Sequence, residues 1–243
     1  MPDLDTLIRS GGPVNGSRVQ RCRAEPAGTG DPMTRTMNSP GAHALREQIC
    51  EAAIDLFAAK GYHGTSMRDL AGAVGVEAAS LYYHFPSKQD ILLALFEGIM
   101  NEQQCMLQAA LLAARRPSEG LRAVTRSHVL YHIMQSKEAF VSHSELRSLT
   151  PANRCQIVTS RDRYEDEIRS LLKAGVVCGE FDIDDVPVAA TALLCMWSGV
   201  SDWIQPRGRL DADEIADIYS AMALRIVGAR EVAAPAAAQA AQH

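Results

Sequence analysis

Apolar residues recur at intervals of three and four along most of the chain, which is the spacing of one face of an α-helix. The first stretch of this kind has its apolar positions at Leu45, Ile49, Ala53, Leu56 and Phe57. Gly61 follows it, and a glycine is typical of the position that ends a helix. No segment alternates between apolar and polar residues as a half-buried strand does. The pattern therefore predicts an all-α fold.

The next two helices are predicted to form a helix-turn-helix. Thr65 or Ser66 can cap the first of them, and Gly75 ends it at a turn where a positive φ is easily adopted. Ala71 is small where the two helices must approach closely, and Leu81 of the very short second helix faces back into the core. Small residues and then polar aromatics on the outer side suit a helix that enters a major groove.

Ser87 is predicted to cap a long helix, with Asp90 in its first turn where a carboxylate favours the helix dipole. This helix continues towards Ala113. Further helices are expected near 118–135, 138–148, 152–175, 185–203 and 211–228. Residues 44–230 are thus long enough to bury a sizeable core.

The composition restricts the class of protein. Hydrophobic residues make up 47% of the 243 positions and charged residues 22%, a globular balance that excludes wholesale disorder. The formal net charge of −5 argues against a protein that coats nucleic acid through bulk positive charge, but it leaves room for a local DNA-reading face. No run reaches the ~20 apolar residues of a membrane span, so we expect no membrane partner.

Two further features favour a cytoplasmic protein. Leu7 and Ile8 are followed at once by Arg9, so the N-terminus lacks the apolar core of a secretory signal. The six cysteines are scattered without a CxxC pair, which favours reduced thiols over a disulfide framework or a zinc site.

Breaks in composition suggest how the chain is divided. Residues 1–40 are rich in Gly, Pro and Ser and are expected to be a disordered tail, in which Met33 or Met37 is an alternative start to Met1. The expected folded units are a helix-turn-helix domain over 41–90 and a second helical domain over 91–230, followed by a disordered Ala-rich tail over 231–243.

The stretch 45–100 resembles the N-terminal DNA-binding domain of TetR-family transcriptional regulators. The residues that carry the resemblance are Ala53, Phe57, Gly61-Tyr62, Thr65-Ser66, Arg68-Asp69-Leu70-Ala71, Gly75-Val76, Ser80-Leu81-Tyr82-Tyr83-His84-Phe85, Lys88 and Leu92. The resemblance implies an all-helical homodimer that binds a palindromic double-stranded DNA operator and represses transcription. Its two half-sites would lie one helical turn, roughly 34 Å, apart.

The resemblance also implies roles for single residues. Ala79, Ser80 and Tyr82 match positions that approach bases, and Arg68 is a candidate for reading a guanine edge. The positions that match phosphate contacts are Tyr83, His84, Lys88 and either Thr65 or Ser66. Glu77 departs from the family pattern, in which Ser or Thr is common at this helix cap. A carboxylate at this position would repel phosphate.

Other interpretations of these residues remain open at the level of sequence. Tyr82 and Tyr83 fit half-buried packing positions as well, and His84 fits a simple helix cap. Arg68 fits a solvated ion pair with Asp69 or Glu97, which would contribute well under ~1 kcal/mol to stability.

His128 and His132 lie four residues apart on one predicted helix, with His143 and Glu145 beyond them. Histidines at this spacing can bind zinc, but the usual supporting Glu-x-x-His context is missing. We therefore expect no metal and no cofactor, and interpret the histidines as polar groups of a pocket or of the core. The alternative is an all-helical metalloenzyme that uses His128 and His132.

Residues 101–230 are loosely similar to the ligand-sensing half of the same family, in a subgroup that regulates lipid and acyl-CoA catabolism. The candidate effector-binding residues are Met100, Met134, Phe140, Arg161 and Trp197. The helices near 185–203 and 211–228 carry extra apolar faces that fit a four-helix dimer interface. The resulting hypothesis is a repressor released by a small molecule such as an acyl-CoA or another lipid-derived compound. The alternative is a dimeric DNA-binding protein without a ligand.

Overall fold

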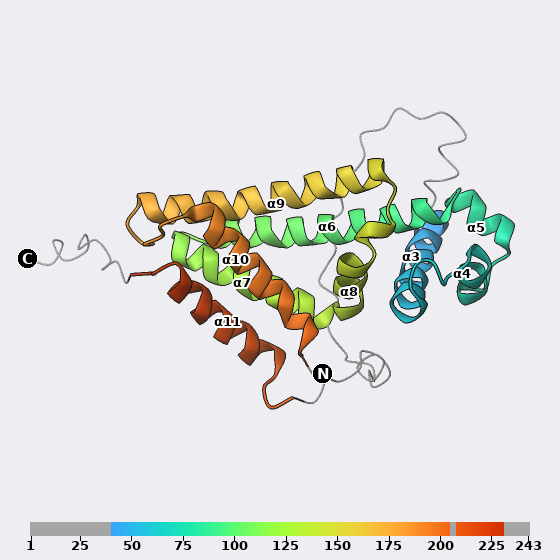
Figure 1. Ribbon diagram of the computed structural model, residues 1–243. Helices are drawn as coiled ribbons and strands as arrows, with labels where there is room; N and C mark the ends of the chain where they lie inside the picture. Colours follow the sequence, from blue (N-terminus) through green and yellow to red (C-terminus); the bar gives the residue numbers. More distant parts are fainter. Residues whose placement is uncertain (1–39, 205–207, 231–243) are drawn as a thin grey trace, which may run out of the picture.

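The computed structural model describes residues 40–204 and 208–230, and all the regular structure in these ranges is helical (Figure 1). The α-helices are α3 (Pro40–Lys60), α4 (Met67–Val74), α5 (Ala78–His84), α6 (Lys88–Ala113), α7 (Pro117–Met134), α8 (Ser136–Ser144), α9 (Pro151–Val177), α10 (Val186–Ser198) and α11 (Ala212–Ile226). Two short 3₁₀ helices, η1 (Leu146–Ser148) and η2 (Gly199–Asp202), follow α8 and α10. The all-α prediction is confirmed.

The capping residues lie where the sequence places them. Ser66 caps α4 and forms a capping box with Asp69, in which each side chain bonds the other residue's backbone N–H. Ser87 caps α6 and accepts a hydrogen bond from the N–H of Asp90. Gly75 has φ 75°, so the left-handed turn after α4 falls on the residue that adopts it most easily.

Helices α3, α4 and α5 form a small unit at one end of the molecule, called the head below (Figure 1). Its core consists of fully buried side chains from all three helices: Ile49, Ala53, Phe57, Leu70 and Leu81. Because α5 has only seven residues, it depends on this packing for its stability.

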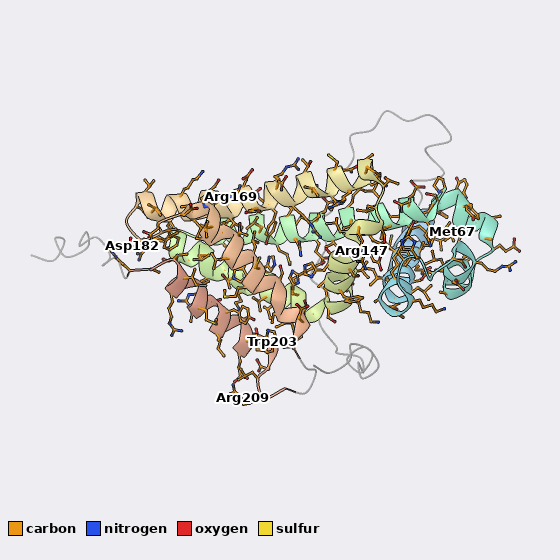
Figure 2. All side chains as sticks on the ribbon, in the orientation of Figure 1. Met67, Arg147, Arg169, Asp182, Trp203 and Arg209 are labelled. Atoms are coloured by element: carbon orange, nitrogen blue, oxygen red, sulfur yellow. The ribbon has the colours of Figure 1, made fainter. Side chains whose placement is uncertain are left out.

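Helix α6 runs from the head into the larger group formed by α6–α11, called the bundle below, where α9 lies alongside it (Figure 1). Leu121, Ile157, Ile168, Leu193 and Trp197 are fully buried in the bundle core. Met67 on α4 and Asp182, after α9, lie toward opposite ends of the molecule (Figure 2).

The structure refines several predicted boundaries. The helix expected over 138–148 is split into α8 and η1, and the helix expected over 185–203 ends at Ser198 and continues as η2. Because α6 begins at Lys88, a domain boundary at residue 90 falls within its first turn, and the division at 90 stays a prediction. The expected tails, 1–40 and 231–243, lie outside the described residues apart from Pro40, where α3 begins.

Within residues 40–204 and 208–230, none of the helices is both long enough and apolar enough to cross a membrane.

Candidate functional site

Helix α5 presents one side to the core and the other to solvent. Leu81 is fully buried and Phe85, directly after the helix, is 1% exposed. Tyr82 and Tyr83 are 49% and 53% exposed, and Ala79 is also exposed. The helix therefore offers solvent a surface of small residues at its start and two tyrosines at its end, as the sequence predicts.

The two candidates at the start of α4 have different environments. Thr65 is 2% exposed, and its hydroxyl donates to the carbonyl oxygen of Gly61 at 3.0 Å. Ser66 is the exposed residue and the actual N-cap. Arg68, two residues later, is exposed on the same helix. Ser66 and Arg68 thus remain accessible, whereas Thr65 stabilises the turn before α4.

His84 is largely covered, with 7% of its surface exposed. Its carbonyl oxygen accepts a hydrogen bond from Nη1 of Arg46 at 2.5 Å, and the Arg46 guanidinium lies 4.0 Å from the centre of the Phe85 ring. These contacts fix the end of α5 against α3. The prediction that His84 contacts phosphate stays untested, and its position fits a packing role as well.

Lys88 has partners that the sequence did not reveal. Its ammonium donates to the carbonyl oxygens of Tyr62 at 2.7 Å and Thr65 at 2.6 Å, and it lies 4.2 Å from the centre of the Tyr62 ring. Partial burial lowers its pKa below the usual value. Lys88 therefore ties the first turn of α6 to the α3–α4 turn, a role that is separate from the phosphate contact predicted for it.

Glu77 is the N-cap residue of α5, is exposed and makes no capping hydrogen bond through its side chain. Its carboxylate is therefore free of any capping role, in agreement with its departure from the Ser or Thr that is common in the family.

A hydrogen-bonded junction joins the head to the bundle. Glu145, after α8, accepts from the N–H of Tyr62 at 3.2 Å and from the hydroxyl of Ser148 at 2.7 Å. The amide of Gln89 donates to the Tyr62 hydroxyl and to the Ser148 carbonyl oxygen, both at 2.7 Å. Its oxygen accepts from the N–H of Thr150 at 3.1 Å. The sequence does not reveal this junction, because the bonds that Tyr62 makes to Gln89 and Glu145 join residues 27 and 83 positions apart.

A row of polar side chains lies inside the bundle and consists of Thr125, His128 and His132 of α7 and Trp197 of α10; it is called the polar row below. The rings of His128 and His132 are stacked at 4.6 Å, and the His128 ring lies 5.4 Å from that of Trp197. His128 is held on both sides, with Nδ1 2.8 Å from the Tyr164 hydroxyl and Nε2 3.3 Å from that of Ser198.

Helix α8 lies next to this row. The ring of His143 stacks over that of His132 at 5.8 Å. Nη2 of Arg161 donates to the carbonyl and hydroxyl oxygens of Ser142, each at 2.9 Å. Arg161, predicted to bind the effector, is thus half-buried beside α8.

The other predicted effector residues differ in how far they are buried. Met100 is 6% exposed, Trp197 is fully buried and Phe140 is half-buried in the bundle. Met134 is 52% exposed at the end of α7, and the structure does not bring it together with them. The periodicity of α7 could not show that its last residue emerges from the bundle.

The metal interpretation gains no support. In the part of the chain that the structure describes, no group of three or more His, Cys, Asp or Glu side chains is placed to hold a metal ion. His128 has both ring nitrogens engaged with hydroxyl groups, as noted above. The histidines are interior polar groups of the bundle.

The buried histidines make stability depend on pH. Burial lowers the pKa of His132 to about 4 and that of His128 well below its usual value, and neighbouring His143 acts in the same direction on both. The unfolded chain, with histidine pKa near 6.5, then binds more protons between pH 6.5 and 4, so stability falls as the pH is lowered.

Lowering the pH from 7 to 5 is expected to cost about 2 kcal/mol of unfolding free energy through His132 alone. Urea denaturation at fixed protein concentration, at pH 7, 6 and 5, measures this loss. Between pH 7 and 5, the variant His132→Leu should lose about 2 kcal/mol less unfolding free energy than the wild-type protein. The same pH dependence in both proteins would contradict the assignment.

Two family descriptions match the two parts of the chain. "Bacterial regulatory proteins, tetR family" matches residues 49–95, and "Tetracyclin repressor-like, C-terminal domain" matches residues 114–227. The first match covers most of the head and the start of α6, and the second covers α7–α11. The helix-turn-helix and the helical bundle are therefore both accounted for.

Individual relatives agree with this assignment. The HTH-type transcriptional repressor KstR2 of Rhodococcus jostii is 28% identical over 193 residues, which are 77% of this chain and 93% of that protein. The crystal structure of the TetR family transcriptional regulator PfmR from Thermus thermophilus has a TM-score of 0.68 at 35% identity, covering 73% of this chain and 97% of that one.

AibR, solved in complex with isovaleryl coenzyme A and operator DNA, has a TM-score of 0.68 at 29% identity, again covering 73% of this chain and 97% of that one. The resemblance seen in the sequence is thus confirmed over both parts of the chain, and the enzyme alternative is excluded. The chain belongs to the TetR family of bacterial transcriptional regulators, which bind DNA.

Proposed function

We propose that this protein is a homodimeric repressor that binds a palindromic operator and is released from it by a small-molecule effector of the acyl-CoA class. The observation that carries the proposal is the outer surface of α5, where Tyr82 and Tyr83 are exposed while Leu81 and Phe85 are buried in the core of the head. About half of each tyrosine side chain is in solvent and available for contact with DNA.

On the operator, α5 would lie in the major groove with its start against the bases. Ala79 and Ser80 are small enough for close approach, and Tyr82 follows them on the outer surface. Arg68 on α4 is exposed and offers a bidentate donor for a guanine edge. Tyr83 and Ser66 would contact phosphates, which set the position of the head without reading sequence.

The dimer would form through α10 and α11. Apolar side chains remain exposed on both helices: Val188 (65%), Ile218 (45%), Met222 (38%) and Ile226 (46%). Apolar patches on two adjacent helices are typical of a protein–protein interface, and a second copy of the chain is the partner that a palindromic operator requires. Both helices fall within the family match at 114–227.

An acyl-CoA effector is proposed on two grounds. AibR was solved with isovaleryl coenzyme A, and it is similar to this chain over 73% of its length. The bundle also contains buried polar groups from α7 and α10 beside apolar side chains, a mixture typical of ligand sites. The effector would act by binding more tightly to a conformer whose two heads no longer match the operator spacing.

The junction of Tyr62, Gln89 and Glu145 would transmit this change. Glu145 follows directly after α8, which lies beside the polar row, and its carboxylate holds the backbone of Tyr62 in the head. A shift of α8 on effector binding would thus alter the angle of the head. Coupling between the effector site and the head requires a physical connection of this kind, whose contacts can adopt two discrete arrangements.

Selection of DNA from a random pool with the full-length protein tests the DNA part of the proposal. We expect enrichment of an inverted repeat whose half-sites are about one helical turn apart. Adding a panel of acyl-CoA thioesters to the complex should release the DNA in a gel-shift assay for at least one member. Enrichment of no sequence would contradict the repressor, and release by no thioester would favour a DNA-binding protein without a ligand.

A further inference from the structure

Several buried polar atoms in the bundle have no hydrogen-bond partner within the described part of the chain. Those that belong to the polar row are Oγ1 of Thr125, both ring nitrogens of His132 and Nε1 of Trp197. Thr125 and Trp197 are fully buried, and His132 is 3% exposed. Native proteins rarely leave such atoms unsatisfied, because each one costs about 1–3 kcal/mol. A stability role alone does not explain three such residues.

These atoms share one region. Thr125, His128 and His132 are three and four residues apart on α7 and therefore lie on the same side of that helix. Trp197 of α10 reaches His128, since the two rings are 5.4 Å apart. His128 is held by hydrogen bonds to Tyr164 and Ser198. Its ring contacts those of His132 and Trp197, whose polar atoms have no hydrogen-bond partner among the described residues.

The chemistry of the row favours a neutral oxygen over an anion. A neutral imidazole at His132 offers one donor and one acceptor, the indole of Trp197 offers one donor, and the Thr125 hydroxyl offers both. A buried carboxylate would need a cation beside it, and Arg161 already donates through Nη2 to both oxygens of Ser142. A ketone or hydroxyl oxygen matches the unsatisfied groups without a charge.

We propose that the polar row recognises a ketone or hydroxyl group on the acyl end of the effector, so that the protein responds to oxygenated acyl groups and not to plain hydrocarbon ones. This inference rests on the proposed function. The charged coenzyme A end then lies away from His132, and the selectivity of the site resides in the acyl end.

The position of the row also links recognition to the head. His143 of α8 stacks on His132, and α8 leads directly to Glu145, which holds Tyr62. An oxygen that bonds His132 therefore changes the surroundings of the helix that is tied to the DNA-binding unit. A hydrocarbon of the same length leaves the His132 nitrogens unpaired and gains less from binding.

Matched probes test the proposal on the full-length protein. The binding of octanoyl-CoA is compared with that of 7-oxooctanoyl-CoA and 8-hydroxyoctanoyl-CoA by calorimetry. The three corresponding free acids are measured as well, because they show whether the acyl group binds without coenzyme A. We expect at least one oxygenated thioester to bind about tenfold or more tightly than octanoyl-CoA. His132→Leu should abolish this ratio, and His132→Gln, which keeps a donor and an acceptor, should preserve most of it.

Stability and DNA binding supply the controls. If the His132 nitrogens serve a ligand, His132→Leu should leave the melting temperature of the free protein unchanged or raise it by about a few degrees, because an unsatisfied buried group is removed. Each variant should still form the operator complex without effector, which shows that its head and its dimer are assembled. A strong loss of stability in the leucine variant would assign His132 to the fold and overturn the proposal.

The outcomes also separate this inference from the proposed function. Equal binding of oxygenated and plain thioesters, or an unchanged ratio in His132→Leu, overturns the inference and leaves an acyl-CoA-responsive repressor standing. If none of the thioesters or acids binds, the effector part of the proposed function fails together with it. If the polar row holds only ordered water, one of the two outcomes above is expected, and the inference is overturned.

Discussion

Replacing Tyr82 with alanine is expected to weaken binding to the selected operator by about 10- to 100-fold, because one base contact is worth about 1–3 kcal/mol. The variant should also discriminate less at the base pair that Tyr82 reads. Tyr83→Ala should weaken binding to all sequences to a similar degree, since a phosphate contact carries no sequence information. Fluorescence anisotropy on the operator and on single-base variants of it separates the two effects.

Both substitutions should leave the fold intact. Tyr82 and Tyr83 are about half exposed, whereas the core contacts of α5 come from Leu81 and Phe85. Leu112→Ala is the matched control, because Leu112 is 84% exposed on α6 and lies outside the head. Wild-type affinity in both tyrosine variants would exclude the outer surface of α5 as the DNA-binding surface.

The sequence predicts the head in more detail than the bundle, and the reason is physical. Caps and turns depend on residues that are three or four positions apart, so Ser66, Ser87 and Gly75 can be identified without the structure. The outward direction of Tyr82 and Tyr83 follows from the inward direction of Leu81 on the same short helix. Local chemistry determines these features.

Contacts between distant segments are not visible in the same way. Lys88 is an N-terminal helix residue in the sequence, and its bonds to carbonyl oxygens 23 and 26 residues away appear only when α6 is placed against the α3–α4 turn. His84 looks like an exposed polar residue at the end of α5 but is covered by its neighbours. In each case the tertiary neighbour decides the environment.

The effector region shows the same limit. The sequence makes Met134 a candidate effector-binding residue, yet α7 ends there and the side chain is 52% exposed. The sequence indicates that His128 and His132 are polar groups of a pocket or of the core, but it does not show that their partners come from α8, α9 and α10. Four helices must be assembled before the donors and acceptors of the polar row can be compared.

Loss of the dimer should have the largest effect on DNA binding. The variant Ile218→Asp/Met222→Asp places two carboxylates on the exposed apolar side of α11, and burying them against a second copy would be very unfavourable. We expect the variant to sediment as a monomer in analytical ultracentrifugation. Its operator affinity should fall by more than about a hundredfold, since each monomer engages one half-site and the gain from linked binding is lost.

The fold of each chain should survive this change, because the side of α11 that faces the bundle core carries other residues, namely Ile215, Ala216, Ser220 and Ala223. Leu112→Asp is the control, since it introduces one carboxylate at a more exposed apolar position on a different helix. If the control is dimeric and the double variant is monomeric, the interface lies on α11. If the double variant stays dimeric with wild-type operator affinity, the second copy packs elsewhere, and the exposed apolar side chains of α10 and α11 need another partner.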